Sequence, residues 1–87
     1  MREPMPIRVK VLYFGQAREA AGTKEEEFSL PSASSVRTLL TRSVEAHHEL
    51  RGMHGAMRFA VNEEIAGEGD RLSDGDVVAF LLPVAGG

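Results

Sequence analysis

The stretch that decides the fold lies near the end of the chain, where residues 77–82 read VVAFLL. Every position in it is apolar, whereas a strand with one face in water alternates between apolar and polar residues. Such a run is typical of a strand that is covered on both faces. The chain therefore predicts a last strand with two apolar faces, each of which needs a cover.

The first strand is predicted at residues 7–14, which read IRVKVLYF and alternate between apolar and polar positions. One face is committed to a core by four side chains: Ile7, Val9, Val11 and Tyr13. Leu12 and Phe14 interrupt the polar face at the end of the strand. If the first and last strands are neighbours, these two residues and the outward residues of the last strand form one exposed apolar patch. Such a patch typically marks a protein partner, although single exposed apolar residues are common on protein surfaces.

Short elements follow the first strand. Residues 15–22, GQAREAAG, predict a turn that contains about one helical turn. Residues 24–30, KEEEFSL, predict a second strand that returns antiparallel to the first. Pro31 ends this strand, and Ser34 or Ser35 can cap the helix that comes next.

One long helix is predicted from Val36 to about His48 or Leu50, because its apolar residues recur on one face. A loop is expected at residues 51–56, RGMHGA, and turns are expected at GEGD and SDGD. Three further strands are predicted at residues 57–62, around Ile65 and at residues 77–82. This order predicts an α+β fold, a mixed sheet of about five strands with one main helix packed across one face. A single helix leaves the outward residues of the last strand uncovered.

Composition predicts one soluble domain over residues 1–87, with residues 1–6 as a loose lead-in and 83–87 as a flexible C-terminal tail. A net charge of −3 argues against nucleic-acid binding, which needs a basic surface. No apolar stretch approaches the ~20 residues of a membrane span, and the start has no signal-peptide core. The chain has no cysteine, which excludes disulfides and thiol chemistry, so a cytoplasmic location is expected.

Candidate metal ligands do not form a recognisable site. The aspartates within residues 70–76 lack the spacing and the closing glutamate of a calcium loop, and are typical of tight turns. His47 and His48 are adjacent and so point to different sides of a helix, and they and His54 are expected to be surface histidines. The sequence therefore predicts no metal site.

Two stretches carry recognisable motifs: VLYFGQAREAAG at residues 11–22 and VNEEI…LSDGDVVAFLLPVAGG at residues 61–87. Both resemble the small, sulfur-carrying subunits of molybdopterin synthase. The most specific feature of the resemblance is the order of a D-G-D turn, an apolar strand, Pro-Val-x-Gly-Gly and the chain end. One position departs from the family pattern: the family often has two prolines before the valine, and Leu82 stands in place of the first. The resemblance implies the ubiquitin-like β-grasp fold, in which the first and last strands lie side by side and parallel in the sheet centre.

The resemblance implies that this chain carries sulfur at its C-terminus. In the family, an ATP-dependent activating enzyme adenylates the final glycine, here Gly87, with Gly86 before it, and sulfur then displaces AMP to leave a thiocarboxylate. The large synthase subunit uses that sulfur to build molybdopterin from cyclic pyranopterin monophosphate, in molybdenum cofactor biosynthesis. The chain is then a non-catalytic, sulfur-donating subunit of a two-component sulfurtransferase, in a heterotetramer with the large subunit. No permanently bound cofactor is implied, since the ATP is used by the activating enzyme.

The tail suits this role physically. Residues 84–87 span about 13–14 Å when extended, which is enough to enter a neighbouring active site. Glycine has no Cβ, so Gly86 and Gly87 can pass through a narrow passage. Pro83 stiffens the exit from the strand, and we expect it and Val84 to contact the partner.

The docking surface is expected on the side of the sheet that faces away from the helix. Face parity on the first strand leaves Phe14 outward, and the resemblance places Val78 and Phe80 toward the helix and Leu81 away from it. Ile65 lies where the family also presents an apolar contact. Phe14, Ile65 and Leu81 are therefore predicted to dock onto the large synthase subunit.

Two other classes of function stay open at this point. One is a related Gly-Gly sulfur carrier for thiamine thiazole or tRNA thiolation, or a ubiquitin-like protein modifier. The other is a plain β-grasp interaction module whose glycines are a frayed end. The sequence leaves open which sulfur acceptor is served, whether proteins are also modified, the oligomeric state of the isolated chain, and whether Gly87 is a native or a processed end.

Overall fold

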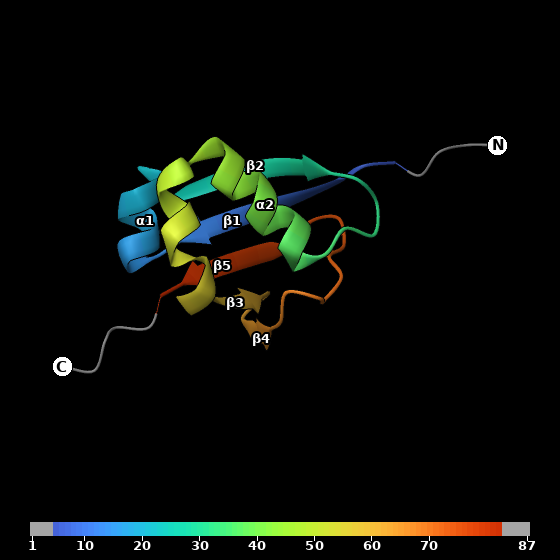
Figure 1. The fold of residues 1–87 in the computed structure, drawn as a ribbon. Helices are drawn as coiled ribbons and strands as arrows, with labels where there is room; N and C mark the ends of the chain where they lie inside the picture. Colours follow the sequence, from blue (N-terminus) through green and yellow to red (C-terminus); the bar gives the residue numbers. More distant parts are fainter. Residues whose placement is uncertain (1–4, 83–87) are drawn as a thin grey trace.

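The computed structural model describes residues 5–82 and contains a five-stranded mixed sheet with its helices on one side (Figure 1). The strands are β1 (Ile7–Tyr13), β2 (Glu25–Leu30), β3 (Arg58–Val61), β4 (Glu64–Ala66) and β5 (Val77–Leu81). The helices are α1 (Gly15–Ala21), α2 (Val36–Ala46) and the 3-10 helix η1 (His48–Ala56). The predicted fold class, an α+β β-grasp with about five strands, is confirmed.

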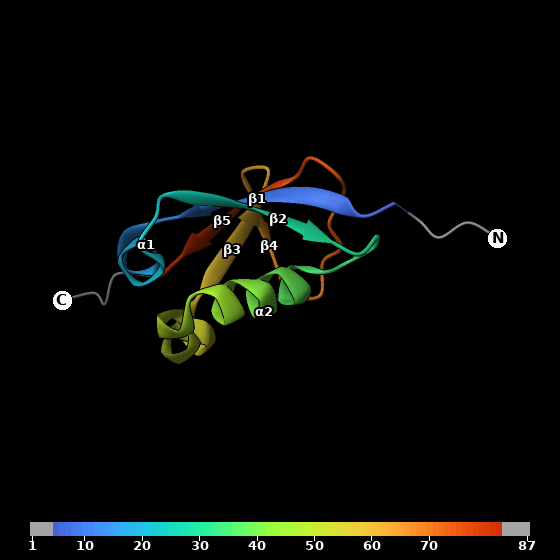
Figure 2. The same cartoon turned by 90° about the horizontal axis from the view of Figure 1, so that it is seen from above.

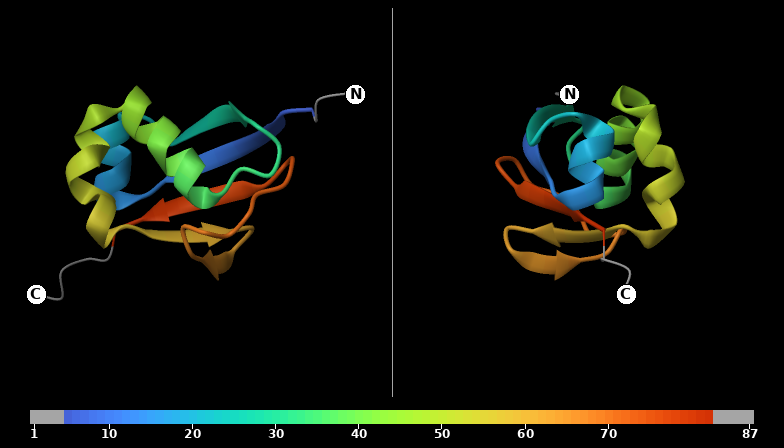
Figure 3. Two further views of the ribbon diagram at one scale, coloured as in Figure 1. Left: turned by 45° about the vertical axis from the view of Figure 1, so that its right-hand side comes forward. Right: turned by 90° about the vertical axis from the view of Figure 1, so that its left-hand side faces the viewer.

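The last strand lies inside the sheet, as its apolar sequence requires. The strand order is β2-β1-β5-β3-β4, and β5 runs parallel to β1, with Lys10 opposite Val77 and Tyr13 opposite Phe80. The other neighbours are antiparallel. The predicted parallel pairing of the first and last strands at the sheet centre is therefore confirmed. β5 runs toward the end of the molecule where α1 and η1 lie (Figure 3).

The core fills the space between the sheet and α2. Alternate residues of β1 and β5 point into it, and Phe80 packs edge-on against Tyr13 and Phe59, with ring centroids 5.7 and 5.2 Å apart. The largest fully buried side chains are Tyr13, Phe80, Leu30, Leu39, Leu50, Val9, Val11, Val36 and Val78. Seen from above, α2 lies on one side of the sheet, and within residues 5–82 no helix covers the other side (Figure 2). We call this uncovered side the outer face.

The helices differ from the sequence prediction in extent. Ser35 caps α2 as expected, with its hydroxyl accepting from the Thr38 N–H at 3.4 Å. The predicted loop at residues 51–56 is wrong, because this segment belongs to η1. Leu50 is fully buried and holds η1 against the core, while two glycines disfavour a continued α-helix.

The segment after β1 is a helix of seven residues, longer than the single turn predicted. Ala17 and Ala21, four residues apart, are both buried, so the second turn is stabilised by packing. Gly22 ends the helix with a φ of 76°, a conformation that favours glycine, and its N–H donates to the Arg18 carbonyl at 2.9 Å.

The aspartate-rich segment forms turns, as predicted. Asp74 accepts from the Arg8 N–H at 2.8 Å, and Asp76 accepts from the Ser73 N–H at 2.8 Å. Gly75 lies between them with a φ of 88°. Within residues 5–82, no three histidine, aspartate or glutamate side chains come together as a metal site would require. In the same range, no helix has the length and apolar character needed to span a membrane.

Candidate functional site

The predicted site residues divide into two groups. Pro83, Val84, Gly86 and Gly87 lie outside the described residues. Phe14, Ile65 and Leu81 lie within them, and their side chains reach solvent to different degrees: Phe14 is 46% exposed, Ile65 is 83% exposed, and Leu81 is half-buried.

Sheet register places Ile65 on the same face as Leu12, the residue before the last residue of β1. Ala79 is paired with both Leu12 and Ala60, and Ala60 is paired with Ile65. Residues directly opposite each other share a face of a sheet. Leu12, Ala79, Ala60 and Ile65 therefore form one row that crosses four strands on the outer face.

A second row on the outer face lies next to the end of β5. Leu81 is paired with Arg58, and the Phe14 N–H donates to the Phe80 carbonyl at 3.2 Å, which places Phe14 beside the end of β5. Val78 and Phe80 are fully buried on the helix side, as predicted. The predicted faces are therefore confirmed, and the docking role of the residues remains a prediction.

The outer face is hollowed in its centre. A hollow of about 440 Å³ is lined by Leu12, Phe14, Ala60, Asn62, Glu63, Val77 and Ala79. The two alanines are paired with each other across β3 and β5, so the sheet surface is low between larger neighbours. The sequence predicts the apolar patch but not this hollow, because the floor of the hollow depends on the register between two strands that are distant in sequence.

The rim of the hollow is a tight turn between β3 and β4. Asn62 and Glu63 both have positive φ, 51° and 73°. The Asn62 side chain is fixed at both ends, since its Nδ2 donates to Asp76 at 2.9 Å and its Oδ1 accepts from the Val77 N–H at 3.0 Å. The sequence predicted strands at residues 57–62 and around Ile65, and it did not indicate the role of either side chain.

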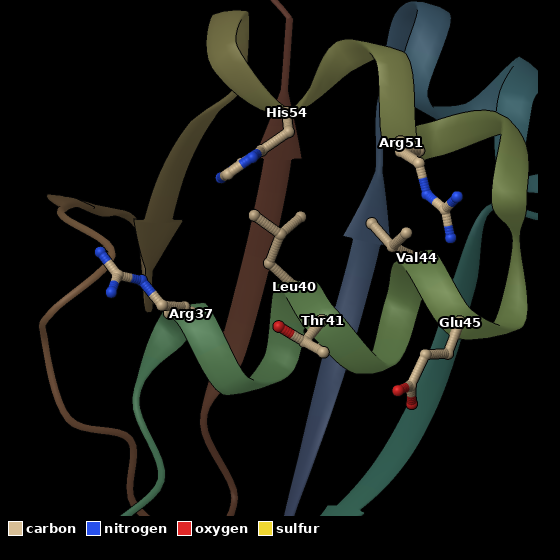
Figure 4. Close-up of a pocket in the computed structure, with 7 residues that line it drawn as sticks. All are labelled: Arg37, Leu40, Thr41, Val44, Glu45, Arg51 and His54. Carbon is tan, nitrogen blue, oxygen red and sulfur yellow. The ribbon is translucent and has the colours of Figure 1, made fainter.

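A second groove, of about 370 Å³, lies on the helix side between α2 and η1 (Figure 4). Leu40 and Val44 stand between the two helices, while Arg51 and His54 come from η1. Glu68 contacts His54 at 3.3 Å and Arg37 at 3.3 Å. These contacts, chiefly the hydrogen bond with His54, lower the pKa of Glu68. Two of the three basic side chains at this groove therefore already have a carboxylate partner.

A polar cluster joins β1, β2 and the end of α2. Glu26 Oε1 accepts from the Tyr13 hydroxyl at 2.9 Å and lies 2.8 Å from His47 Nε2. Burial, reinforced by Glu26, raises the pKa of Tyr13 well above its ordinary value. The prediction of His47 as a surface histidine is wrong: it is half-buried, and its ring packs edge-on against Tyr13. This cluster holds the helix to the sheet.

Comparison with known proteins gives consistent matches along nearly the whole chain. Residues 11–87 match the ThiS family. The molybdopterin synthase sulfur carrier subunit of Chlamydomonas reinhardtii is 37% identical over 83 residues, covering 93% of this chain and 100% of the relative. The subunit of the same name from Mycobacterium tuberculosis is 40% identical over 82 residues, covering 93% and 99%.

Solved structures share the fold. A putative molybdopterin converting factor subunit 1 from Pyrococcus furiosus superposes with a TM-score of 0.81 at 32% identity, covering 90% of this chain and 99% of that one. Small archaeal modifier protein 1 from Methanosarcina acetivorans has a TM-score of 0.83 at 25% identity, covering 97% and 100%. A complex of subunits 1 and 2 of the molybdopterin-converting factor from Helicobacter pylori contains a chain with a TM-score of 0.63 at 28% identity, covering 93% and 100%.

Proposed function

The chain belongs to the ThiS family, and on that premise we propose that it is the sulfur carrier subunit of a molybdopterin synthase. The names of its relatives support this choice within the family, since they match over nearly their whole length. The observation that carries the proposal is the position of the apolar outer face, which lies beside the end of β5, and β5 is the last strand before residues 83–87 in the sequence.

The large synthase subunit is the proposed partner of the outer face. Phe14 and Ile65 are large apolar side chains held in water, and Leu81 shares their face. Burying them against a partner removes apolar surface from water, which is the main source of association free energy. The Helicobacter pylori structure holds a similar chain in a complex with its subunit 2. We expect the same kind of docking here, within a heterotetramer.

The chemistry is proposed at the carboxyl group of Gly87. An ATP-dependent activating enzyme first joins this carboxylate to AMP, and pyrophosphate leaves. Sulfide then attacks the same carbon atom to form a carbon–sulfur bond, the bond to the AMP oxygen breaks, AMP leaves with its electron pair, and a thiocarboxylate remains. That sulfur is donated to cyclic pyranopterin monophosphate in the active site of the large subunit. Activation is needed because a carboxylate oxygen is a poor leaving group.

Five residues separate the described structure from the proposed reacting atom. Fully extended, residues 83–87 span about 16–18 Å. We propose that Pro83 and Val84 contact the large subunit, and that Gly86 and Gly87 enter its pocket because they have no Cβ. The docked sheet would then hold the start of this segment at a fixed distance from that pocket.

Intact mass spectrometry tests this proposal. The full chain, incubated with the activating enzyme, ATP and a sulfur source, should gain the mass difference between sulfur and oxygen. A chain that lacks Gly87 and a chain extended by one alanine after Gly87 should both show no gain. Sulfur acquired by either altered chain would contradict the proposal that Gly87 carries it.

A second function is favoured by the likeness to small archaeal modifier protein 1. A protein modifier would use the same activated C-terminus but would form an amide bond to a lysine of another protein. Denaturing electrophoresis of the incubated chain with a cell extract separates the two functions. Covalent conjugates that need Gly87 would support the modifier, whereas a thiocarboxylate that forms no conjugates and converts cyclic pyranopterin monophosphate with the large subunit supports the sulfur carrier.

A further inference from the structure

We propose that the hollow in the outer face receives an arginine side chain from the docking protein, with its guanidinium against the carboxylate of Glu63. This inference deepens the proposed function and rests on it for the identity of the partner. It names what the partner must present at the centre of the interface, beyond general apolar contact.

The shape of the hollow fits the stem of a long side chain. Its floor is the paired alanines Ala60 and Ala79, and Leu12 and Val77 form apolar walls. The aliphatic part of an arginine buries well along such a surface while its charged end stays at the edge. With a volume of about 440 Å³, the hollow is large enough for one such side chain.

The charged residues around the hollow favour a positive group near Glu63. Glu63 lies at its rim, and none of the ion pairs among residues 5–82 includes Glu63. Lys10, which lies on the outer face next to Val77, is paired with Glu25 at 3.4 Å. The other end of the face carries Arg58, opposite Leu81, which repels a cation. A positive group entering the hollow is therefore directed toward Glu63.

The backbone at Glu63 supports a role for its side chain. Two-residue hairpin turns with positive φ at both positions favour asparagine followed by glycine. This turn has Asn62 first and Glu63 second, with φ values of 51° and 73°. A glutamate in this conformation costs conformational free energy that a glycine would avoid. Strained residues of this kind cluster at ligand clamps and other functional sites, and here the strained residue places a carboxylate on the rim of the hollow.

Arginine fits better than the two other common anchors. An aromatic or aliphatic plug would cover Glu63 without pairing it, which is unfavourable for a charged group. Lysine is more strongly hydrated and is depleted at interfaces, whereas arginine is enriched there. The planar guanidinium also donates two parallel hydrogen bonds to one carboxylate, which lysine cannot do.

A titration with a small probe tests the hollow without any partner protein. Isotope-labelled full chain is titrated by NMR with argininamide and, separately, with its uncharged analogue citrullinamide. We expect saturable shifts at Ala60, Glu63 and Ala79 with a dissociation constant of about 1 mM or weaker, for argininamide only. Equal shifts with citrullinamide, or none at these positions, would overturn the inference.

Matched variants assign the effect to one carboxylate. Glu63→Gln should abolish the argininamide response, whereas Glu64→Gln should keep it. Glu64 is the next residue and begins β4, and its side chain lies on the other face of the sheet from that of Ile65. Glu64→Gln therefore makes the same change in net charge away from the hollow. If Glu63→Gln responds like the unaltered chain, the guanidinium is not held by Glu63 and the inference is wrong.

The affinity of Glu63 variants for the large synthase subunit is the second test of the inference. Glu63→Gln should lower the affinity about tenfold and weaken its salt dependence. Glu63→Gly should lower the affinity similarly while raising the melting temperature of the free chain, because the strain is relieved. If both variants bind the large subunit with the affinity of the unaltered chain, the inference is wrong and the proposed function is unaffected. An unaltered chain that does not bind the large subunit overturns the proposed function, and the argininamide titration then decides the inference alone.

Discussion

Two phenylalanines on opposite sides of the sheet offer a direct test of the face assignment. Phe14 and Phe80 are joined by a backbone hydrogen bond of 3.2 Å, yet Phe80 is fully buried and Phe14 is 46% exposed. Truncation of either to alanine removes the same atoms. Phe80→Ala should therefore report on the core, and Phe14→Ala on the docking surface.

The expected magnitudes differ clearly. Phe80 packs against both Tyr13 and Phe59, and truncating a buried phenylalanine costs about 3–5 kcal/mol of unfolding free energy. A domain of 87 residues has a total of only about 4–13 kcal/mol, so Phe80→Ala should remove a large part of its stability. Phe14 has nearly half of its surface exposed to water, so Phe14→Ala should lower the unfolding free energy by only about 1 kcal/mol. Its helix-capping contacts come from its backbone, which the substitution keeps.

Urea unfolding followed by circular dichroism measures the first effect, and calorimetry with the large synthase subunit measures the second. Phe14→Ala should lose about thirtyfold in affinity, the effect of removing a 2 kcal/mol anchor. Two results would refute the reasoning. If Phe14→Ala unfolds as easily as Phe80→Ala, the faces are assigned wrongly; if it binds with full affinity, Phe14 is not an anchor.

Two further predictions concern stability. Burial raises the pKa of Tyr13 above its ordinary ~10, so the folded state favours the neutral phenol. The stability that the neutral phenol contributes to the folded state is present below pH ~10 and is lost as the pH rises further. Tyr13→Phe should cost about 1 kcal/mol at neutral pH through the lost Glu26 hydrogen bond, and the difference between the two proteins should shrink in alkali; a difference that stays constant would contradict this account. Ser35→Ala should lower the unfolding free energy by about 1 kcal/mol because it removes the cap of α2, while the exposed Ser32→Ala should change it little; equal effects in chemical denaturation would show that the cap contributes nothing.

Features that repeat along one strand were predictable from the sequence. The alternation of residues 7–14 gave the correct face for Phe14, and the continuous apolar run at 77–82 predicted a strand covered on both faces. The faces of Phe80 and Leu81 were implied by the family resemblance. Features that join distant segments were not. The hollow exists because Ala60 and Ala79 are paired, and η1 is held by the burial of Leu50 against elements far along the chain.

The position of β5 suits a coupling between the two proposed events, docking of the outer face and delivery of Gly87 to the partner. Phe80 is held by two aromatic neighbours in the core, and Leu82 packs against the same core. Leu81, between them, belongs to the outer face. The end of β5 therefore carries a core anchor, Phe80, and a proposed docking residue, Leu81, in consecutive positions, and Leu82 is the last described residue before 83–87. Sites built on packed strands hold their geometry better than sites on loops. A partner bound to the outer face would thus fix the point from which Gly87 is presented, without any rearrangement of the domain.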